Sequence, residues 1–383
     1  MRFEEIYTQR QAKKLSIEEA ARLLNIHERT FRRWCQNYEE EGAQGLVDQR
    51  LDRIAHNAAE TNEVMAVITL FETRYPRFNV SHFFEKYATE HKGGRSYTWV
   101  KNQLQEAGLV KKAKKKGAHR RKREREPMAG MMIHQDGSSH EWVPGQIWDL
   151  IVTMDDANSE IYSMCFVEEE GTFSSLRGVR DVILKKGLFC SFYSDRGSHY
   201  WTTPKAGEKV DRANLTQFGR AMKELGIEMI PAYSPEARGR SERMFKTLQG
   251  RLPNELALAG ITNIQAANEF LETVYLKAHN ERFCVKPSSC EEAFVAWNDT
   301  TQKLDDILCL QESRVAGQDN TVSYKSKKLQ IPKDQHRYHY AKKTVLVREY
   351  QDGSMSLAFG PRCLGYYDPA GKLIELASAT KAA

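Results

Sequence analysis

The sequence lacks the features that mark membrane proteins and proteins of oxidising compartments. No apolar run approaches the roughly 20 residues that a bilayer-spanning helix needs, and the charged start MRFEEIYTQR has no apolar signal-peptide region. Its seven cysteines are scattered without a CxxC pair, which argues against a disulfide framework and against a zinc site. We therefore expect a cytoplasmic protein with no membrane partner.

The first helical pattern lies in residues 1–56 and predicts a helix-turn-helix domain. Ser16, with Glu19 three residues later, forms the sequence pattern of a capping box. After a turn at residues 25–27, a second helix is expected to begin near Glu28 and to bury Phe31. The basic side chains on its outer face are expected to contact DNA: Arg29, Arg32 and Arg33. The alternative is a three-helix module that binds protein, since the net charge of this pattern is near zero.

A second, weaker pattern of the same kind covers residues 57–110. Its third helix is expected in SYTWVKNQLQEAGLV, with Ser96 as the N-cap and Gly108 just past the end. Lys101 and Asn102 lie on its outer face, and these residue types contact base edges or phosphates in a major groove. Two tandem modules would suit a long, asymmetric DNA site.

Charge is balanced outside one short segment. Residues 1–100 hold 15 basic and 15 acidic side chains and residues 128–383 hold 31 and 33, whereas residues 101–127 hold 11 and 3. Such a run, without apolar periodicity, is typical of a linker, assigned here to residues 111–127. It is expected to lie along phosphates, and the alternative is a solvated tether. The expected contacts are Lys114, Lys115, Arg120 and Arg121.

After Pro127 the composition changes to that of strands. MMIHQD, WDLIVTM and EIYSMCFVEE are expected to be strands, with the turn DDANS between the last two. A helix in TFSSLRGVRDVILKKG then leads to the buried run LFCSFYS. This order predicts an α/β sheet of the RNase H-like kind, assigned with its following helices to residues 128–304. Residues 305–383 have short strands and a turn at Asp352-Gly353, typical of a small all-β barrel.

Three carboxylates in this region form the candidate catalytic site. Asp136 lies inside the first strand, where a carboxylate is costly to bury unless it is paired or binds metal. Asp195 follows a buried strand directly, and Glu242 lies on a later helix expected to start at Ser234 and Pro235. Asp155 and Asp156 are assigned to the hairpin turn.

Three carboxylates of this kind suit phosphodiester chemistry. Two divalent ions about 4 Å apart can clamp the attacking and leaving oxygens of a phosphodiester. Mg²⁺ fits carboxylate ligands best, and Mn²⁺ could replace it. Asp136, Asp195 and Glu242 are therefore the expected catalytic and metal-binding residues.

These residues resemble the DDE transposases of bacterial insertion sequences, with an integrase-type catalytic core, in the ISNCY-like group. The strings that carry the resemblance are HQDGSSHEW, FCSFYSDRGSHY and AYSPEARGRSERMFKTLQGRLPNEL. The resemblance implies recognition of transposon ends by the N-terminal helices, action on target DNA, and a homo-oligomer assembled on paired ends in a bacterial nucleoid. The alternative function is a sequence-specific DNA-binding regulator whose RNase H-like domain is catalytically silent and serves assembly; a nonspecific nuclease is a third.

Overall fold

The computed structural model describes residues 2–47, 59–112, 123–204, 208–233, 239–333 and 336–374. The chain divides into two compact units, Met1–Arg74 and Tyr75–Ala383. No helix in the described ranges is long and apolar enough to cross a membrane.

The first unit consists of helices. They are α1 (Phe3–Gln11), α2 (Ile17–Leu23), α3 (Glu28–Glu41), the 3-10 helix η1 (Gly42–Leu46) and α4 (Thr61–Arg74). Ile6, Ala20, Ala21 and Phe31 form the core that joins the first three helices. The predicted capping box of α2 is confirmed, because Ser16 and Glu19 each bond the other's backbone amide. The helix-turn-helix arrangement expected here is therefore present.

The second unit begins with two further helices, α5 (Val80–Thr89) and α6 (Tyr97–Glu106). Ser96 caps α6 as predicted, and Gly108 takes a positive φ of 75° just past its end. Polar bonds hold α5 to α10 (Leu252–Leu258): His82 and Lys86 both contact the Glu255 carboxylate, at 2.6 and 3.0 Å. Helix α5 therefore packs on α10 of the α/β core.

The core contains a five-stranded mixed sheet in the order β3-β2-β1-β4-β5. Its strands are β1 (Met132–Val143), β2 (Gln146–Asp155), β3 (Ile161–Val167), β4 (Ser191–Ser194) and β5 (Glu228–Pro231). The first three pair antiparallel, whereas β4 is parallel to β1 and β5 to β4. This is an RNase H-like arrangement, as predicted. β1 is longer than the sequence pattern indicated, because its polar second half pairs with β2 as far as Val143.

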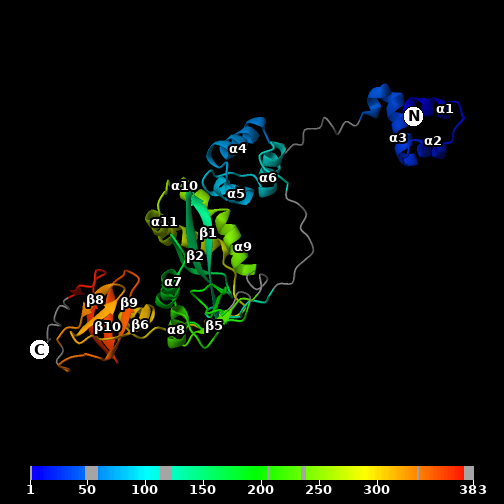
Figure 1. Cartoon of the computed structure of the whole chain (residues 1–383). Coiled ribbons are helices and arrows are strands. Elements are labelled where there is room, and N and C mark those ends of the chain that lie inside the picture. Colours follow the sequence, from blue (N-terminus) through cyan, green and yellow to red (C-terminus); the bar gives the residue numbers. More distant parts are fainter. Residues whose placement is uncertain are drawn as a thin grey trace. The chain divides into compact units, whose positions relative to one another are not determined.

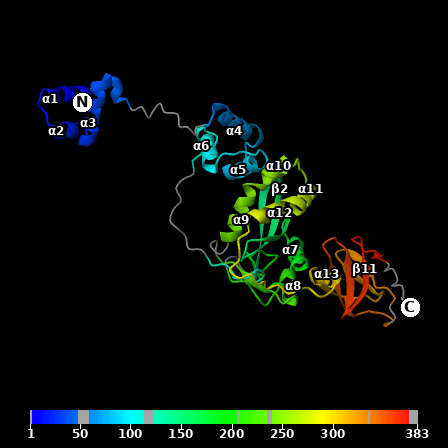
Figure 2. The same ribbon diagram turned by 180° about the vertical axis from the view of Figure 1, so that it is seen from behind.

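Helices cover both faces of this sheet (Figure 1). One face packs against α7 (Thr172–Lys185), α8 (Gln217–Glu224) and α13 (Thr301–Ile307), the last labelled in Figure 2. The other face packs against α9 (Gly239–Gln249), α10, α11 (Ile264–Phe270) and the π-helical turn η3 (Leu271–Tyr275), which continues into α12 (Leu276–Phe283). Asp136 is paired with Val152, a member of the core on the α9 side, so Asp136 faces that side too.

The C-terminal region is all-β, as expected. Five strands form an antiparallel sheet in the order β12-β11-β10-β9-β6, and β7 and β8 form a hairpin. The strands are β6 (Leu310–Val315), β7 (Thr321–Tyr324), β8 (Lys327–Gln330), β9 (Thr344–Glu349), β10 (Met355–Phe359), β11 (Arg362–Tyr367) and β12 (Leu373–Ile374). Sheet and hairpin share one apolar core, to which Val322, Leu329 and Val347 contribute. The predicted turn at Asp352-Gly353 joins β9 to β10.

Candidate active site

Asp136 and Asp195 occupy equivalent positions on neighbouring parallel strands. The pairing of β1 with β4 matches His134 with Tyr193, and each aspartate lies two residues beyond its member of that pair. Because side chains alternate along a strand and paired strands lie about 4.8 Å apart, both carboxylates belong to one edge of the sheet. Asp136 is 8% exposed and Asp195 is half-buried. Asp195 Oδ1 accepts a 2.9 Å bond from the amide of Gly197, which holds the turn after β4.

Two polar contacts align α9 with the same face of β1. Near the start of the helix, Arg240 pairs with the carboxylate of Asp156, and that carboxylate lies 2.7 Å from His134 Nε2 on β1. At the end of the helix, Gln249 Nε2 donates to Ser138 Oγ on β1 over 3.0 Å. His134, Asp136 and Ser138 lie on one face of β1, because side chains alternate along a strand. Since the two contacts lie on either side of position 136, α9 passes alongside Asp136.

Glu242 projects from α9 toward this side of the sheet. It precedes Gln249 by seven residues. Over seven residues an α-helix rotates by two full turns less about 20°. The two side chains therefore leave the helix in nearly the same direction, and Gln249 contacts β1. Glu242 is exposed, as expected for a group at an open edge. Ser234 and Pro235, predicted to begin this helix, lie outside the described residues.

The three carboxylates do not form a preassembled ligand set. Across the described ranges, no three His, Cys, Asp or Glu side chains are close enough together to hold a metal ion. The donor chemistry still suits a hard cation, because Asp136 and Asp195 share one sheet edge and are oxygen ligands.

A buried polar network supports the sheet next to Asp136. Gln135 Nε2 donates to Thr153 Oγ1 over 2.7 Å, and the Tyr200 hydroxyl donates to Gln135 Oε1 over 2.8 Å. Ser175 Oγ of α7 in turn donates to the Tyr200 hydroxyl over 3.1 Å. Burial raises the pKa of Tyr200 well above its ordinary value, and the negative charges of Glu170, Asp195 and Asp136 raise it further. Tyr200 is therefore a neutral donor beneath the carboxylates.

Glu170 is an acidic neighbour that the sequence reasoning did not single out. A Cβ added at Gly137, next to Asp136, would lie 2.2 Å from Glu170 Oε2, so this carboxylate reaches the strand backbone beside the candidate site. His199 Nε2 lies 3.4 Å from Glu170 Oε1, an ion-pair distance for a protonated ring, without making a hydrogen bond. The only signal in the sequence is an acidic run, EEEG, that precedes α7. Such runs are common on surfaces, so it does not point to a site.

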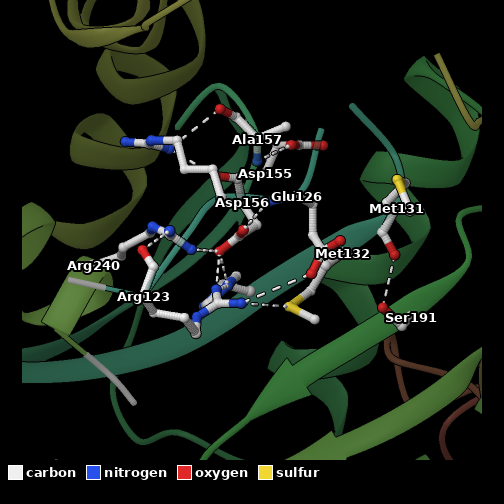
Figure 3. Close-up of polar contacts among 11 residues, drawn as sticks. Arg123, Glu126, Met131, Met132, Asp155, Asp156, Ala157, Ser191 and Arg240 are labelled. Carbon is white, nitrogen blue, oxygen red and sulfur yellow. Dashed lines mark hydrogen bonds and ion pairs between the residues drawn. The ribbon is translucent and has the colours of Figure 1, made fainter. Parts of the chain in front are cut away.

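The two aspartates assigned to the β2–β3 turn are both buried. Asp155 accepts bonds from the backbone amides of Gly130 and Ala157, each over 2.8 Å. Asp156 is surrounded by cationic groups, and Figure 3 shows Arg123 and Arg240 converging on its carboxylate. Asp156 lies in the turn as predicted, whereas Asp155 is the last residue of β2, and both aspartates bond groups of the core.

The predicted DNA contacts fall into three groups. Arg29, Arg32 and Arg33 are exposed on α3, as expected for an outer face. On α6, Asn102 is exposed and Lys101 is half-buried. The linker residues Lys114, Lys115, Arg120 and Arg121 lie outside the described residues.

Comparisons with known proteins agree with these features. Residues 9–53 match a family model described as a helix-turn-helix domain. A protein of Sinorhizobium fredii, y4bF, named as a candidate transposase, is 27% identical over 355 residues, which cover 92% of this chain and 77% of that protein. The transposase for insertion sequence IS1202 of Streptococcus pneumoniae is 30% identical over 239 residues, covering 61% of this chain and half of that protein's length.

Solved structures give weaker matches. A simian T-cell lymphotropic virus intasome, in complex with PP2A regulatory subunit B56 gamma, matches 80% of this chain and all of that chain at 14% identity, with a TM-score of 0.36. The HTLV-2 integrase catalytic core domain in complex with magnesium matches 37% of this chain and 82% of that chain at 10% identity, with a TM-score of 0.26. Such scores do not establish a shared fold. By sequence, however, the chain resembles bacterial insertion-sequence transposases over most of its length, as its motifs predicted.

Proposed function

We propose that this protein is a DNA transposase that binds the terminal repeats of an insertion sequence and cuts and joins DNA strands there. The observation that carries the proposal is the placement of Asp136 and Asp195 at one sheet edge with α9, and hence Glu242, along the same face. The names of the two curated relatives support the same reaction class.

In this proposal the three carboxylates hold divalent metal ions. Asp136 and Asp195 are anchored by strands, and Glu242 is carried by α9. Bound Mg²⁺ would polarise the scissile phosphodiester and make water, or a DNA 3′-OH, a better nucleophile. The carboxylates are ligands and not nucleophiles, so no covalent intermediate between protein and DNA is expected.

The remaining segments would position DNA and assemble the oligomer. We assign end recognition to the exposed α3 arginines and to Asn102 and Lys101 of α6, and phosphate contact to the basic linker. The proposal includes domains that end at residues 56, 110 and 304 and a linker that ends at residue 127. A homo-oligomer on paired ends, acting on target DNA in the bacterial nucleoid, completes it.

A second candidate function is a DNA-binding regulator with a catalytically silent core. One observation favours it: within the described ranges the carboxylates are not gathered into a metal-binding group. The two functions make different predictions about chemistry at the DNA ends.

The test is a cleavage and strand-transfer assay on labelled DNA that carries the element's flanking repeats. Wild-type protein is compared with Asp195→Asn and Glu242→Gln, in Mg²⁺ and in Ca²⁺. We expect Mg²⁺-dependent nicking and joined products from wild type, and a loss of at least about 1000-fold in both variants with DNA affinity retained. Tight, specific binding without cleavage in Mg²⁺ or Mn²⁺ would favour the regulator instead.

A further inference from the structure

The carboxylate of Asp156 has four bonding partners from three separate segments of the core. It is fully buried, yet it accepts bonds from the side chains of Arg123 and Arg240, from the amide of Glu126 over 2.8 Å, and from His134 (Figure 3). These groups come from the segment before β1, from β1 itself and from α9. A buried charge is tolerated only when it is paired and hydrogen-bonded, so these partners are held together as a set.

Arg240 is the member of this set that lies on the helix carrying Glu242. It is the second residue of α9, two positions before Glu242. Its guanidinium also donates to the backbone carbonyl of Arg123 over 2.8 Å, so two separate acceptors fix it. At 17% exposure its side chain is turned to the core and is poorly placed to contact DNA.

The rest of α9 is held differently. Phe245 and Leu248 pack into the apolar core, and Gln249 bonds β1 at the far end. The hydrophobic effect opposes separation of a helix from a sheet, because separation exposes apolar area. It opposes sliding and tilting of the helix end less well, because it is not directional. The ion pair of Arg240 supplies the missing constraint at the end where Glu242 lies.

We infer that Asp156 and Arg240 form a positioning pair, which holds the first turn of α9 against the sheet and so sets the place of Glu242 relative to Asp136 and Asp195. This inference rests on the proposed function. Neither residue is expected to touch substrate; both act through Glu242. A displacement of about 1 Å at a catalytic group can lower a rate by about 100-fold, so loss of the pair should be visible in the chemistry.

The test compares Arg240→Gln with Arg180→Gln in the full-length protein. Arg180 makes a half-buried ion pair with Asp305, 2.6 Å long, between α7 and α13, so its variant loses an arginine–aspartate pair away from α9. We expect Arg240→Gln to slow single-turnover cleavage at saturating end DNA by about 10- to 100-fold, with DNA affinity within twofold of wild type. Arg180→Gln should cleave within about threefold of wild type.

A second readout does not depend on cleavage. Mn²⁺ binding, followed by electron paramagnetic resonance, should weaken in Arg240→Gln toward the level of Glu242→Gln and stay unchanged in Arg180→Gln. Arg240→Lys, which keeps a cation near Asp156, should restore part of both the rate and the Mn²⁺ affinity. The double variant Asp156→Asn/Arg240→Gln should be no slower than Asp156→Asn alone, because the two residues act as one unit.

Two outcomes would overturn the inference. Equal losses of rate in Arg240→Gln and Arg180→Gln, in step with their thermal midpoints, would mean that the pair only stabilises the fold. A loss of DNA affinity in Arg240→Gln with normal cleavage at saturation would make Arg240 a DNA contact. If wild type cleaves no DNA, the proposed function fails, and the Mn²⁺ measurement still decides whether the pair positions Glu242.

Discussion

Two adjacent aspartates show how the surroundings of a residue decide its chemistry. Asp155 has mainly neutral partners, the amides of Gly130 and Ala157 and the Tyr162 hydroxyl, and burial raises its pKa despite these bonds. Burial also acts to raise the pKa of Asp156, but hydrogen bonding and neighbouring cationic groups outweigh it and hold that pKa below its usual range. Asp156 is therefore ionised at neutral pH, whereas burial favours neutral His134, whose pKa is lowered.

The hydroxyl of Tyr200 allows a prediction at this scale. Tyr200→Phe removes the donor to Gln135 Oε1 and the acceptor of Ser175, leaving buried polar groups without their partner. We expect the free energy of unfolding to fall by about 1–3 kcal/mol in chemical denaturation. The matched control is Tyr233→Phe, at a tyrosine that is 53% exposed, where a change within about 0.5 kcal/mol is expected. Equal effects in the two variants would contradict the role of the network.

At the scale of elements, α7 comes unusually close to the sheet because of one glycine. A Cβ at Gly178 would lie 2.2 Å from Gln135 Nε2 and 2.4 Å from Thr153 Oγ1. These two atoms bond each other across β1 and β2, so they cannot move aside without breaking a buried hydrogen bond. The position of α7 against the sheet therefore depends on the absence of a side chain at Gly178.

Gly178→Ala tests this close approach. Alanine favours a helix intrinsically, so a stabilisation would be expected if space were free. We expect the opposite, a loss of about 1–3 kcal/mol, because overpacking displaces the Gln135–Thr153 bond. Gly219→Ala in α8 is the control: its Cβ would meet no atom closer than 3.5 Å, so it should be neutral or stabilising in the same denaturation experiment.

At the scale of the whole molecule, buried histidines link stability to pH. His82, where α5 meets α10, and His134 of β1 both have pKa values lowered by burial. His279 of α12 packs between Tyr275 and Phe283, and burial followed by the nearby charge of Arg251 lowers its pKa to about 4. Acidification should therefore weaken several parts of the second unit together.

The sign follows from proton binding. An unfolded histidine titrates near pH 6.5, so between about pH 6.5 and 4 the unfolded chain binds more protons than the folded one at His279. The free energy of unfolding should fall with pH in this window, by at most about 1.4 kcal/mol per pH unit for each such histidine, and this contribution should level off below the folded pKa.

The check is urea denaturation of wild type and His279→Phe at several pH values from 7 to 5. Phenylalanine keeps the ring packing but does not titrate, so the variant should show a shallower loss of stability on acidification. An identical pH dependence in the two proteins would show that His279 carries none of this linkage.

Local chemistry explains why much of the fold could be predicted from the sequence. Capping residues such as Ser16 and Ser96 act within a few positions of themselves, and the alternation around Asp136 is a property of one strand. The glutamate at position 242 could likewise be assigned to a helix. The polar half of β1 was missed because its own residues do not have the pattern of a strand. It is a strand because its backbone pairs with β2.

The sequence by itself therefore determined the types and order of the elements with clear local patterns, and the three carboxylates that mark a candidate site, but not α8 or β5. Only the tertiary structure decided that Asp136 and Asp195 share one edge, that Glu170 reaches β1 at Gly137, and that Asp156 ties Arg240 to the sheet. The physical reason is distance along the chain. Capping and periodicity act over a few residues, whereas the register of β1 with β4 and the contact of residue 156 with residue 240 depend on the packing of the whole core.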